Sequence, residues 1–159
     1  MIKLEQYRDT WLSEKFDEVI GFYPREFYPL DNFSSFKVKW NGYLYSSLEE
    51  AFQSRLFLPD YPEIADKIKN SYSAHEAQKI MFDNIDKVKY SNEEQVLIME
   101  ELLRLKVEQN PYVKKKLLQT KDYLIVEDSP KDSFWGWGSN RDGSNELGKI
   151  WMKIRDEIK

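Results

Sequence analysis

The sequence predicts one mostly α-helical α+β domain with a few short antiparallel strands. The chain has 159 residues, which suffice for one hydrophobic core but not for two comfortable domains. Most segments carry helix caps or apolar residues at helical spacing, whereas only a few short stretches have the pattern of strands. We therefore expect helices to dominate the fold.

The strands are expected at one hairpin and at one later segment. Residues Phe36–Trp40 alternate apolar and polar side chains, and Asn41-Gly42 separates them from Tyr43–Tyr45. Asn and Gly both tolerate the positive φ angles of a type I′ turn, so this pattern predicts an antiparallel hairpin. Tyr123–Glu127 is short and β-branched, which predicts another strand.

The expected helices begin and end at recognisable signals. Pro59 stops the helix that Ser46-Ser47 opens, and Ser91 with Glu94 forms a capping box. Asn110-Pro111 supplies a cap followed by Pro at the first helical position. The predicted helices cover residues 3–19, 46–58, 61–70, 74–83, 91–107, 110–119 and 144–158.

Composition narrows the class of protein. The longest apolar runs are a few residues, far below the roughly 20 that a membrane-spanning helix needs. Residues 1–15 are mixed and charged, unlike a signal peptide. Cysteine is absent, which excludes disulfides and thiol catalysis. We expect a soluble cytoplasmic protein with no membrane partner. Because the net charge is −4, any contact with nucleic acid should be local.

The helix after the hairpin carries an acidic residue on its apolar side. At about 100° per residue, Phe52 and Leu56 fall within about 60° of Glu49, and Gln53 is its polar neighbour one turn along. The remaining side holds Glu50, Ala51, Ser54 and Arg55. A buried carboxylate in a cleft is a candidate general acid or base.

Glu49 also has a purely structural interpretation. If Ser46 is the helix cap, Glu49 is the third helical residue and closes a capping box. If Ser47 is the cap, that task falls to Glu50 and Glu49 is free. Spacing alone leaves the two alternatives even.

A second group of residues follows the later strand. The stretch 127–138 combines acidic residues with Trp135-Gly136-Trp137-Gly138. Such a loop could stack a flat base against an indole and bring backbone close to a ligand. It could equally be a loop that its tryptophans pin to the core, and the aromatic content of 15% fits an aromatic core in the same way. Residues alone favour the structural interpretation for both.

Other chemistry finds little support. His75 is the only histidine and has no partner motif for a catalytic triad, so we expect it on a helix surface. No cluster has metal-ligand spacing and no glycine-rich phosphate loop occurs, so we expect neither metal nor cofactor. Lys114–Lys116 is expected to be a solvated helix face.

Five segments, in order, resemble the NADAR (YbiA-like) family. They are Leu30–Phe33, Ser47–Gln53, Lys106–Pro111, Ile125–Glu127 with Asp132–Gly138, and Gly143–Gly148 with Met152 and Arg155. The match runs from Phe22 to the C-terminus. The resemblance implies a YbiA-like fold for residues 21–159, with residues 1–20 as a helical extension.

Three positions depart from the family pattern. Glu50 stands where many members have His, and Leu56 replaces a family Lys, with Arg55 one residue earlier. Tyr90 lies near the place of a family Trp. These differences concern the choice of substrate more than the type of reaction.

The resemblance implies an N-glycosidase. Known members hydrolyse phosphoribosylated riboflavin-pathway intermediates, and others remove ADP-ribose from guanine in DNA. Cleavage of a ribose C1–N bond builds oxocarbenium character that a carboxylate stabilises, by analogy with sugar hydrolysis. We assign Glu49 to water activation or cation stabilisation, Asp132 to orientation or proton transfer, and Trp135 to base stacking. We expect Glu49 to face the Trp135 loop across a shared cavity. Further candidate contacts to substrate are Asn32, Phe33, Gln53, Arg55, Lys106, Glu127, Gly136, Gly138 and Asn145.

Several alternatives stay open. The substrate is a small phosphoribosyl or ADP-ribosyl compound, or ADP-ribosylated DNA. A module that binds ADP-ribose or nucleotides without turnover is a different class of function, and so is an interaction protein that uses Tyr7 and Trp11. The oligomeric state is open.

Overall fold

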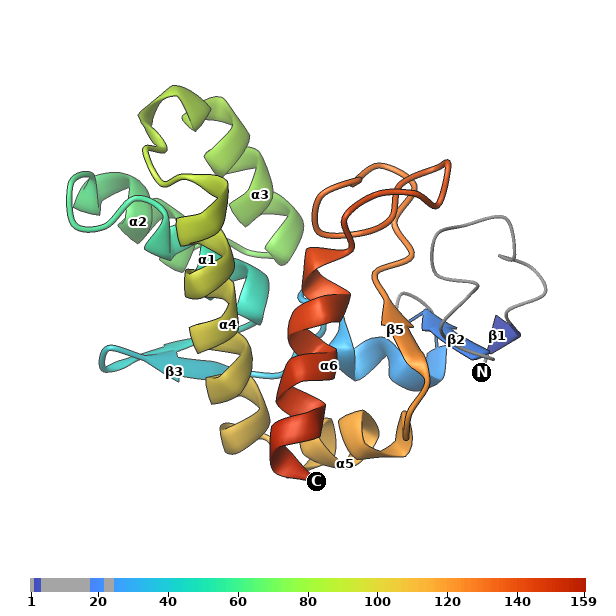
Figure 1. The fold of residues 1–159 in the computed structure, drawn as a ribbon. Helices are drawn as coiled ribbons and strands as arrows, with labels where there is room; N and C mark the ends of the chain where they lie inside the picture. The colour runs from blue at the N-terminus through green and yellow to red at the C-terminus, as the bar shows by residue number, and fades with distance from the viewer. Residues whose placement is uncertain (1, 4–17, 22–24) are drawn as a thin grey trace. The chain divides into compact units, whose positions relative to one another are not determined.

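The computed structural model describes residues 2–3, 18–21 and 25–159. Backbone contacts divide the chain into two compact units (Figure 1). One unit is Asn32–Pro111, and the other combines Met1–Asp31 with Tyr112–Lys159. No helix in the described part of the chain is both long and apolar enough to cross a bilayer.

The unit of residues 32–111 begins with the predicted hairpin. Strand β3 (Val38–Trp40) pairs antiparallel with β4 (Tyr43–Tyr45), and Val38 lies opposite Tyr45. Asn41 and Gly42 have φ angles of 50° and 81°, as the type I′ turn requires. The hairpin prediction is therefore confirmed.

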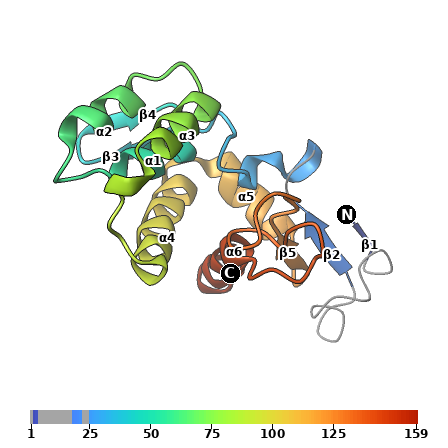
Figure 2. The same cartoon turned by 90° about the horizontal axis from the view of Figure 1, so that it is seen from above.

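Four helices and a short 3-10 turn complete this unit. They are α1 (Leu48–Arg55), α2 (Pro62–Lys69), α3 (Ala74–Asp83), the 3-10 turn η3 (Ile85–Lys87) and α4 (Asn92–Gln109). Helix α1 lies among α2, α3 and α4 and also contacts the hairpin (Figure 2). It ends three residues earlier than the predicted Leu58, and backbone-bonded turns replace its last predicted turn. The bounds of α3 and the capping box of α4 are confirmed.

The other unit contains a small mixed sheet. Strand β1 (Ile2–Lys3) pairs antiparallel with β2 (Glu18–Gly21), and β2 pairs parallel with β5 (Leu124–Val126). The sheet thus adds one parallel pair to the antiparallel strands that the sequence predicts. All three β5 residues are buried, as is usual in parallel pairing.

The described ends of the predicted helix over residues 3–19 are not helical. Lys3 lies in β1, and Glu18 and Val19 lie in β2. The β-branched pair Val19-Ile20 suits a strand, and pairing with β5 outweighs the helical spacing of the apolar positions. Residues 4–17, with Tyr7 and Trp11, lie outside the described residues.

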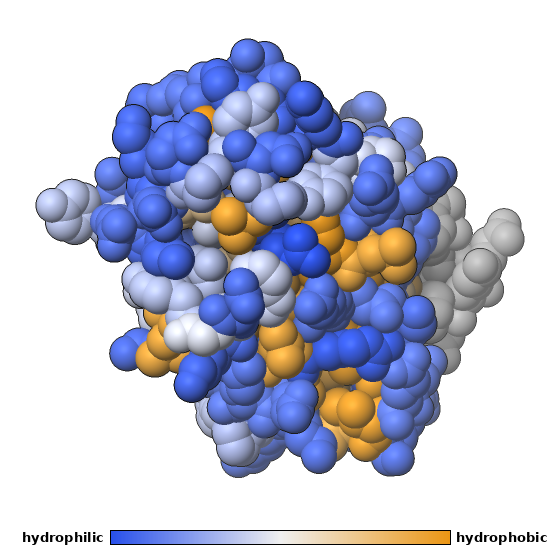
Figure 3. Space-filling view, turned by 90° about the vertical axis from the view of Figure 1, so that its left-hand side faces the viewer, coloured by the Kyte–Doolittle hydropathy of each residue, from blue (hydrophilic) through white to orange (hydrophobic). Residues whose placement is uncertain are grey.

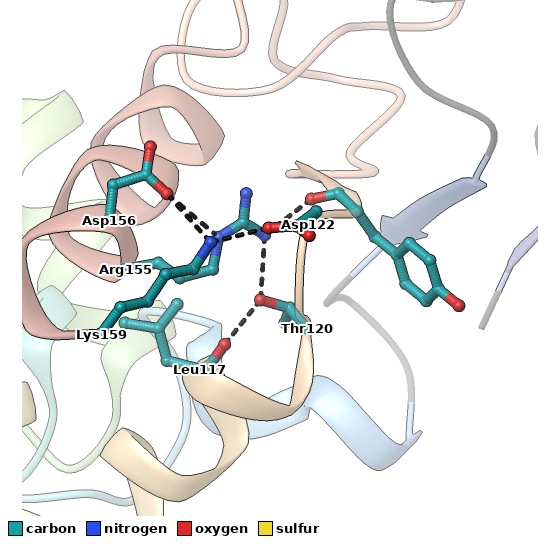
Figure 4. Close-up of polar contacts among 7 residues, drawn as sticks. Leu117, Thr120, Asp122, Arg155, Asp156 and Lys159 are labelled. Carbon is teal, nitrogen blue, oxygen red and sulfur yellow. Dashed lines mark hydrogen bonds and ion pairs between the residues drawn. The ribbon is translucent and has the colours of Figure 1, made fainter.

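Two helices and a 3-10 segment complete this unit. They are η2 (Arg25–Leu30), α5 (Pro111–Gln119) and α6 (Glu146–Ile158), and α6 packs against β5. Trp151 of α6 is fully buried and donates its indole N–H to the carbonyl of Leu30 at 3.0 Å. The buried Arg155 donates to the Thr120 hydroxyl at 3.1 Å and to the Tyr123 carbonyl at 2.7 Å, which ties α6 to the turn before β5 (Figure 4).

The surface in Figure 3 is mainly hydrophilic, and its apolar residues form separate patches. Large apolar side chains that are exposed in the described part of the chain include Phe82, Ile85 and Leu97. Single exposed apolar residues are normal on soluble proteins and carry no functional conclusion.

Candidate active site

Helix α1 carries Glu49 into the interior of the unit of residues 32–111. Ser47 is the helix cap, because its hydroxyl accepts the backbone N–H of Glu50 at 3.2 Å. Glu50 is therefore the third helical residue, and Glu49 is free of the capping box. The side chain of Glu49 is 5% exposed. The structure thus settles the two alternatives for this residue in favour of an inward carboxylate.

The other side of α1 is buried as well. Glu50, Ala51 and Ser54 are 3%, 0% and 0% exposed, and only Arg55 is half-buried. The reason is that α2, α3, α4 and the hairpin surround α1, so every side of the helix has a packing partner. A helical wheel assumes one solvent face and cannot detect this arrangement.

Glu49 is bonded to two other candidate residues. The Gln53 side-chain amide donates to the Glu49 carboxylate at 2.7 Å, one turn along α1. The backbone N–H of Glu49 donates to the Asn32 carbonyl at 3.0 Å, which joins the segment before β3 to the start of α1. We call Glu49, Gln53 and Asn32 the Glu49 group.

Two acceptors of the Glu49 group have no hydrogen-bond partner among the described residues. The side-chain oxygens of Asn32 and Gln53 are buried and accept no hydrogen bond within the described part of the chain. Their residues are 7% and 4% exposed. A buried unsatisfied polar atom costs about 1–3 kcal/mol and in a native protein calls for an explanation. Together with the Glu49 carboxylate, these oxygens would accept hydrogen bonds from a ligand that carries several hydroxyl groups.

Phe33, Arg55 and Lys106 make other contacts in this unit. The half-buried Phe33 ring meets the edge of His75 with 4.7 Å between ring centroids. The Arg55 guanidinium lies 4.8 Å from the Trp40 ring and 3.6 Å from the Glu101 carboxylate, so the hairpin and α4 hold it.

Lys106 is fully buried on α4. Its ammonium donates to the Ser34 hydroxyl at 3.1 Å and lies 6.0 Å from the Phe36 ring. Ser34 belongs to the same segment as Asn32 and Phe33, so Lys106 anchors the chain that delivers Asn32 to Glu49. This geometry favours a supporting role for Lys106 over direct contact with phosphate.

Glu50 is the functional candidate that sequence reasoning missed. Its carboxylate accepts a hydrogen bond from the Ser47 hydroxyl at 3.4 Å. Burial raises the pKa of the Glu50 carboxyl group; the Ser47 hydrogen bond opposes this in part, and the Glu76 carboxylate adds to it. No periodicity signals such a residue, because the burial of Glu50 comes from the elements that pack around α1 and not from α1 itself.

The loop after β5 contains the remaining candidates, in the other unit. Its two indoles differ. Trp137 is 1% exposed and donates to the Asp128 carboxylate at 2.8 Å, so it pins the loop to the core. Trp135 is half-buried and meets the edge of the Phe134 ring with 4.9 Å between centroids. Trp135 is therefore the indole with surface left for a ligand.

Asp132 organises this loop. One carboxylate oxygen accepts the backbone N–H groups of Phe134 and Trp135 at 3.0 and 2.8 Å. This turn fixes where the Trp135 side chain leaves the backbone. Of the two roles expected for Asp132, the geometry favours orientation over proton transfer.

Asn145 holds the loop to β5. It adopts the left-handed conformation with φ 49°, and its side chain is fully buried. The amide oxygen accepts the Glu127 N–H and the amide nitrogen donates to the Ile125 carbonyl, both at 3.0 Å. Since both polar ends are occupied by backbone, the geometry favours a structural role over substrate contact.

The two candidate glycines allow the loop to pack against itself. A Cβ on Gly136 would lie 2.5 Å from the Glu127 carbonyl, and Gly138 has a φ of +70°. Glu127 itself is 9% exposed, and its carbonyl accepts the Trp137 N–H at 3.3 Å. These glycines therefore allow close packing within the loop itself, whereas the sequence suggested a close approach to a ligand.

The candidates thus fall into two sets. Within residues 32–111 the structure gathers Asn32, Glu49 and Gln53 and ties Arg55 and Lys106 to other partners. Within the loop after β5 it gathers Glu127, Asp132, Trp135, Gly136, Gly138 and Asn145. No cluster of acidic or histidine residues in the described part of the chain could hold a metal ion.

Comparison with known proteins gives consistent relatives. The NADAR domain model matches residues 13–159. The N-glycosidase YbiA of Shigella boydii serotype 4 is 30% identical over 145 residues, which cover 89% of each chain. The chloroplastic riboflavin biosynthesis protein PYRR of Zea mays is 28% identical over 167 residues, or 94% of this chain and 27% of that protein.

A solved structure supports the same relationship. The NMR structure of Escherichia coli YbiA superposes with a TM-score of 0.78 at 26% identity and covers 88% of this chain and 84% of that one. The mostly helical α+β architecture expected from the sequence is confirmed. The chain belongs to the NADAR family.

Proposed function

We propose that this protein is an N-glycosidase that hydrolyses the bond between ribose C1 and a base nitrogen. The observation that carries the proposal is the buried Glu49 carboxylate beside two unpaired acceptor oxygens. Ribose supplies hydroxyl donors for such acceptors, and a carboxylate at C1 stabilises the positive charge that develops there. The relatives named as N-glycosidases support this reaction type.

In the proposed reaction, Glu49 acts as the general base. The C1–N bond breaks and its electron pair leaves with the base, which takes up a proton. Water adds to C1 as Glu49 accepts one of its protons, and Glu49 then releases that proton to solvent. Gln53 donates a hydrogen bond to the Glu49 carboxylate at 2.7 Å. Such a donor stabilises the ionised carboxylate, which is the form that accepts the proton from water.

We assign Trp135 to stacking on the leaving base and Asp132 to orientation of the loop that carries it. The bonds from Phe134 and Trp135 N–H to Asp132 support the second role. That Glu49 and this loop act on one substrate stays a prediction.

The substrate class that we propose is a phosphoribosylated pyrimidine of the riboflavin pathway. The name of the maize relative supports it, as does the net charge of −4, which disfavours a broad contact with DNA. Removal of ADP-ribose from guanine in DNA is the competing reaction, and ligand binding without turnover is the competing class.

The test is to incubate the purified protein with three substrates in parallel. These are a ribosylamino-pyrimidine 5-phosphate, its dephosphorylated form and an ADP-ribosylated DNA oligonucleotide. We expect free ribose 5-phosphate from the first. Release of ADP-ribose only from the third would replace the substrate class and keep the reaction type. Binding without release of any sugar would overturn the proposal.

A further inference from the structure

A cavity of about 220 Å³ lies at the far end of α1 from Glu49. The turn of residues 56–61 lines one side, and residues between 87 and 94 line the other. Leu56, at its edge, follows Glu49 by seven positions, or about 10 Å along a helix. None of the candidate active-site residues lines this cavity.

Backbone hydrogen bonds fix the first wall. The N–H groups of Phe57, Leu58 and Tyr61 donate to carbonyls one turn earlier at 3.1, 3.3 and 2.7 Å. Phe57 is 1% exposed and anchors the turn in the core. The Tyr90 hydroxyl donates to the Leu58 carbonyl at 2.6 Å and so joins the two walls. The shape of the cavity therefore needs no ligand to form it.

The lining combines aromatic rings with cations. Tyr61 and Tyr90 supply the rings, and Lys87 and Lys89 supply the ammonium groups. Lys87 lies 3.7 Å from the exposed Asp86 carboxylate, and such surface pairs contribute little. Lys89 is exposed and forms no ion pair within the described part of the chain.

Two acids, Asp60 and Glu94, also line the cavity, so the lining carries no net formal charge. Glu94 already serves the capping box of α4, where its carboxylate accepts the Ser91 N–H at 3.0 Å. Asp60 is exposed and lies on the opposite wall from the lysines. Lys87 and Lys89 are two positions apart on one wall, so an anion between them could contact both ammonium groups.

We propose that this cavity binds a small planar anion, such as an aromatic carboxylate. The ring would lie against Tyr61 and Tyr90 above the apolar Phe57, and the carboxylate would meet Lys87 and Lys89. The volume is below the roughly 300–1,000 Å³ of sites for drug-sized ligands, which limits the ligand to about one ring. This site is independent of the proposed hydrolysis.

The test is an NMR titration of the isotope-labelled full chain with three matched probes. Benzoate carries ring and charge, benzamide carries the ring alone, and cyclohexanecarboxylate carries charge without a planar ring. We expect saturable shifts in the amides of residues 57–61 and 87–90 with benzoate, and about tenfold weaker binding of each other probe, or about 1.4 kcal/mol. Equal affinity for benzoate and benzamide would overturn the role of the lysines.

Variants locate the site. The double variant Lys87→Gln with Lys89→Gln should weaken benzoate binding about tenfold or more. Tyr61→Phe, which keeps the ring and leaves the Tyr90 hydrogen bond in place, should retain most of it. Lys79→Gln is the control, because Lys79 is an exposed lysine paired with Asp83 outside the cavity. The proposal would be refuted if benzoate shifted the amides of the double variant as strongly as those of the parent protein. It would also be refuted if saturating benzoate caused no shifts in the parent protein.

Discussion

The Glu49 group and the loop after β5 differ in how their polar side chains are paired. In the loop, Asp132 and Asn145 each accept or donate to backbone groups, and the N–H groups of residues 144–147 all find carbonyls of residues 133–136. In the Glu49 group, the side-chain oxygens of Asn32 and Gln53 are buried and accept no hydrogen bond from any residue that the structure describes.

This difference in pairing distinguishes polar atoms that stabilise the fold from polar atoms that are available to a ligand. A polar atom that is paired within the chain stabilises the fold and has little left to offer a substrate. A polar atom that is buried and unpaired destabilises the free protein, and a ligand that pairs with it recovers that cost on binding. We therefore propose that Asn32, Glu49 and Gln53 contact the substrate and that Asp132 and Asn145 set the geometry of the loop.

The largest expected effect concerns Glu49. Glu49→Gln keeps the side-chain volume and can keep the hydrogen bond with Gln53, but it removes the carboxylate that serves as general base. We expect hydrolysis to fall about 100- to 10,000-fold while the free energy of unfolding stays the same or rises. Single-turnover release of the base measures the rate, and urea denaturation measures stability. Glu108→Gln, an exposed acid on α4, is the control and should leave both unchanged.

The two indoles should respond in opposite ways. Trp137→Ala removes a buried ring and its bond to Asp128, so we expect a loss of about 3–5 kcal/mol in the free energy of unfolding. Trp135→Ala removes a half-buried ring and should cost only about 1 kcal/mol of stability while it weakens turnover. Denaturation curves and kcat/KM of the pair give the contrast. A Trp135→Ala variant with full activity would remove the stacking role.

Substitutions of two asparagines, one with paired and one with unpaired side-chain atoms, test this distinction. Asn145→Ala leaves the Glu127 N–H and the Ile125 carbonyl without their hydrogen-bond partner and places alanine at φ 49°. We therefore expect a loss of at least about 3 kcal/mol in the free energy of unfolding. Asn32→Leu removes an unpaired oxygen and only a weak 3.6 Å bond to the Met99 sulfur, so its stability should be unchanged or higher. Asn32→Leu should instead raise KM. A large loss of stability in Asn32→Leu would contradict the assignment.

The smallest effect is a dependence of stability on pH. Because burial raises the pKa of Glu50, the folded protein prefers the protonated form, and this contribution is present at low pH and is lost as pH rises through the raised pKa. Glu50→Gln imitates the protonated acid. We expect it to match the parent protein at acid pH and to become the more stable of the two as pH rises. A difference in unfolding free energy that does not change with pH would contradict this.

Local signals in the sequence predict the local structure well. The Asn41-Gly42 turn, the Ser91–Glu94 capping box and the bounds of α3 all depend on contacts within a few residues, and all are confirmed. The inward position of Glu49 also follows from local spacing, because its neighbours on α1 share its apolar side.

Features that depend on distant partners could not be predicted. The burial of Glu50 and Ser54 comes from the other helices around α1, which no wheel drawn on one helix contains. The parallel pairing of β2 with β5 joins residues more than 100 positions apart, and neither segment encodes the direction of its partner. The structural roles of Asp132 and Asn145 depend likewise on which backbone groups the folded loop brings to them.

The most direct measurement is a crystal structure of the Glu49→Gln variant with an uncleaved ribosylated substrate. We predict ribose hydroxyl groups at about 3 Å from the side-chain oxygens of Asn32 and Gln53, and ribose C1 next to residue 49. A substrate that binds with no ribose atom in hydrogen-bonding distance of any of these three side chains would contradict the central claim.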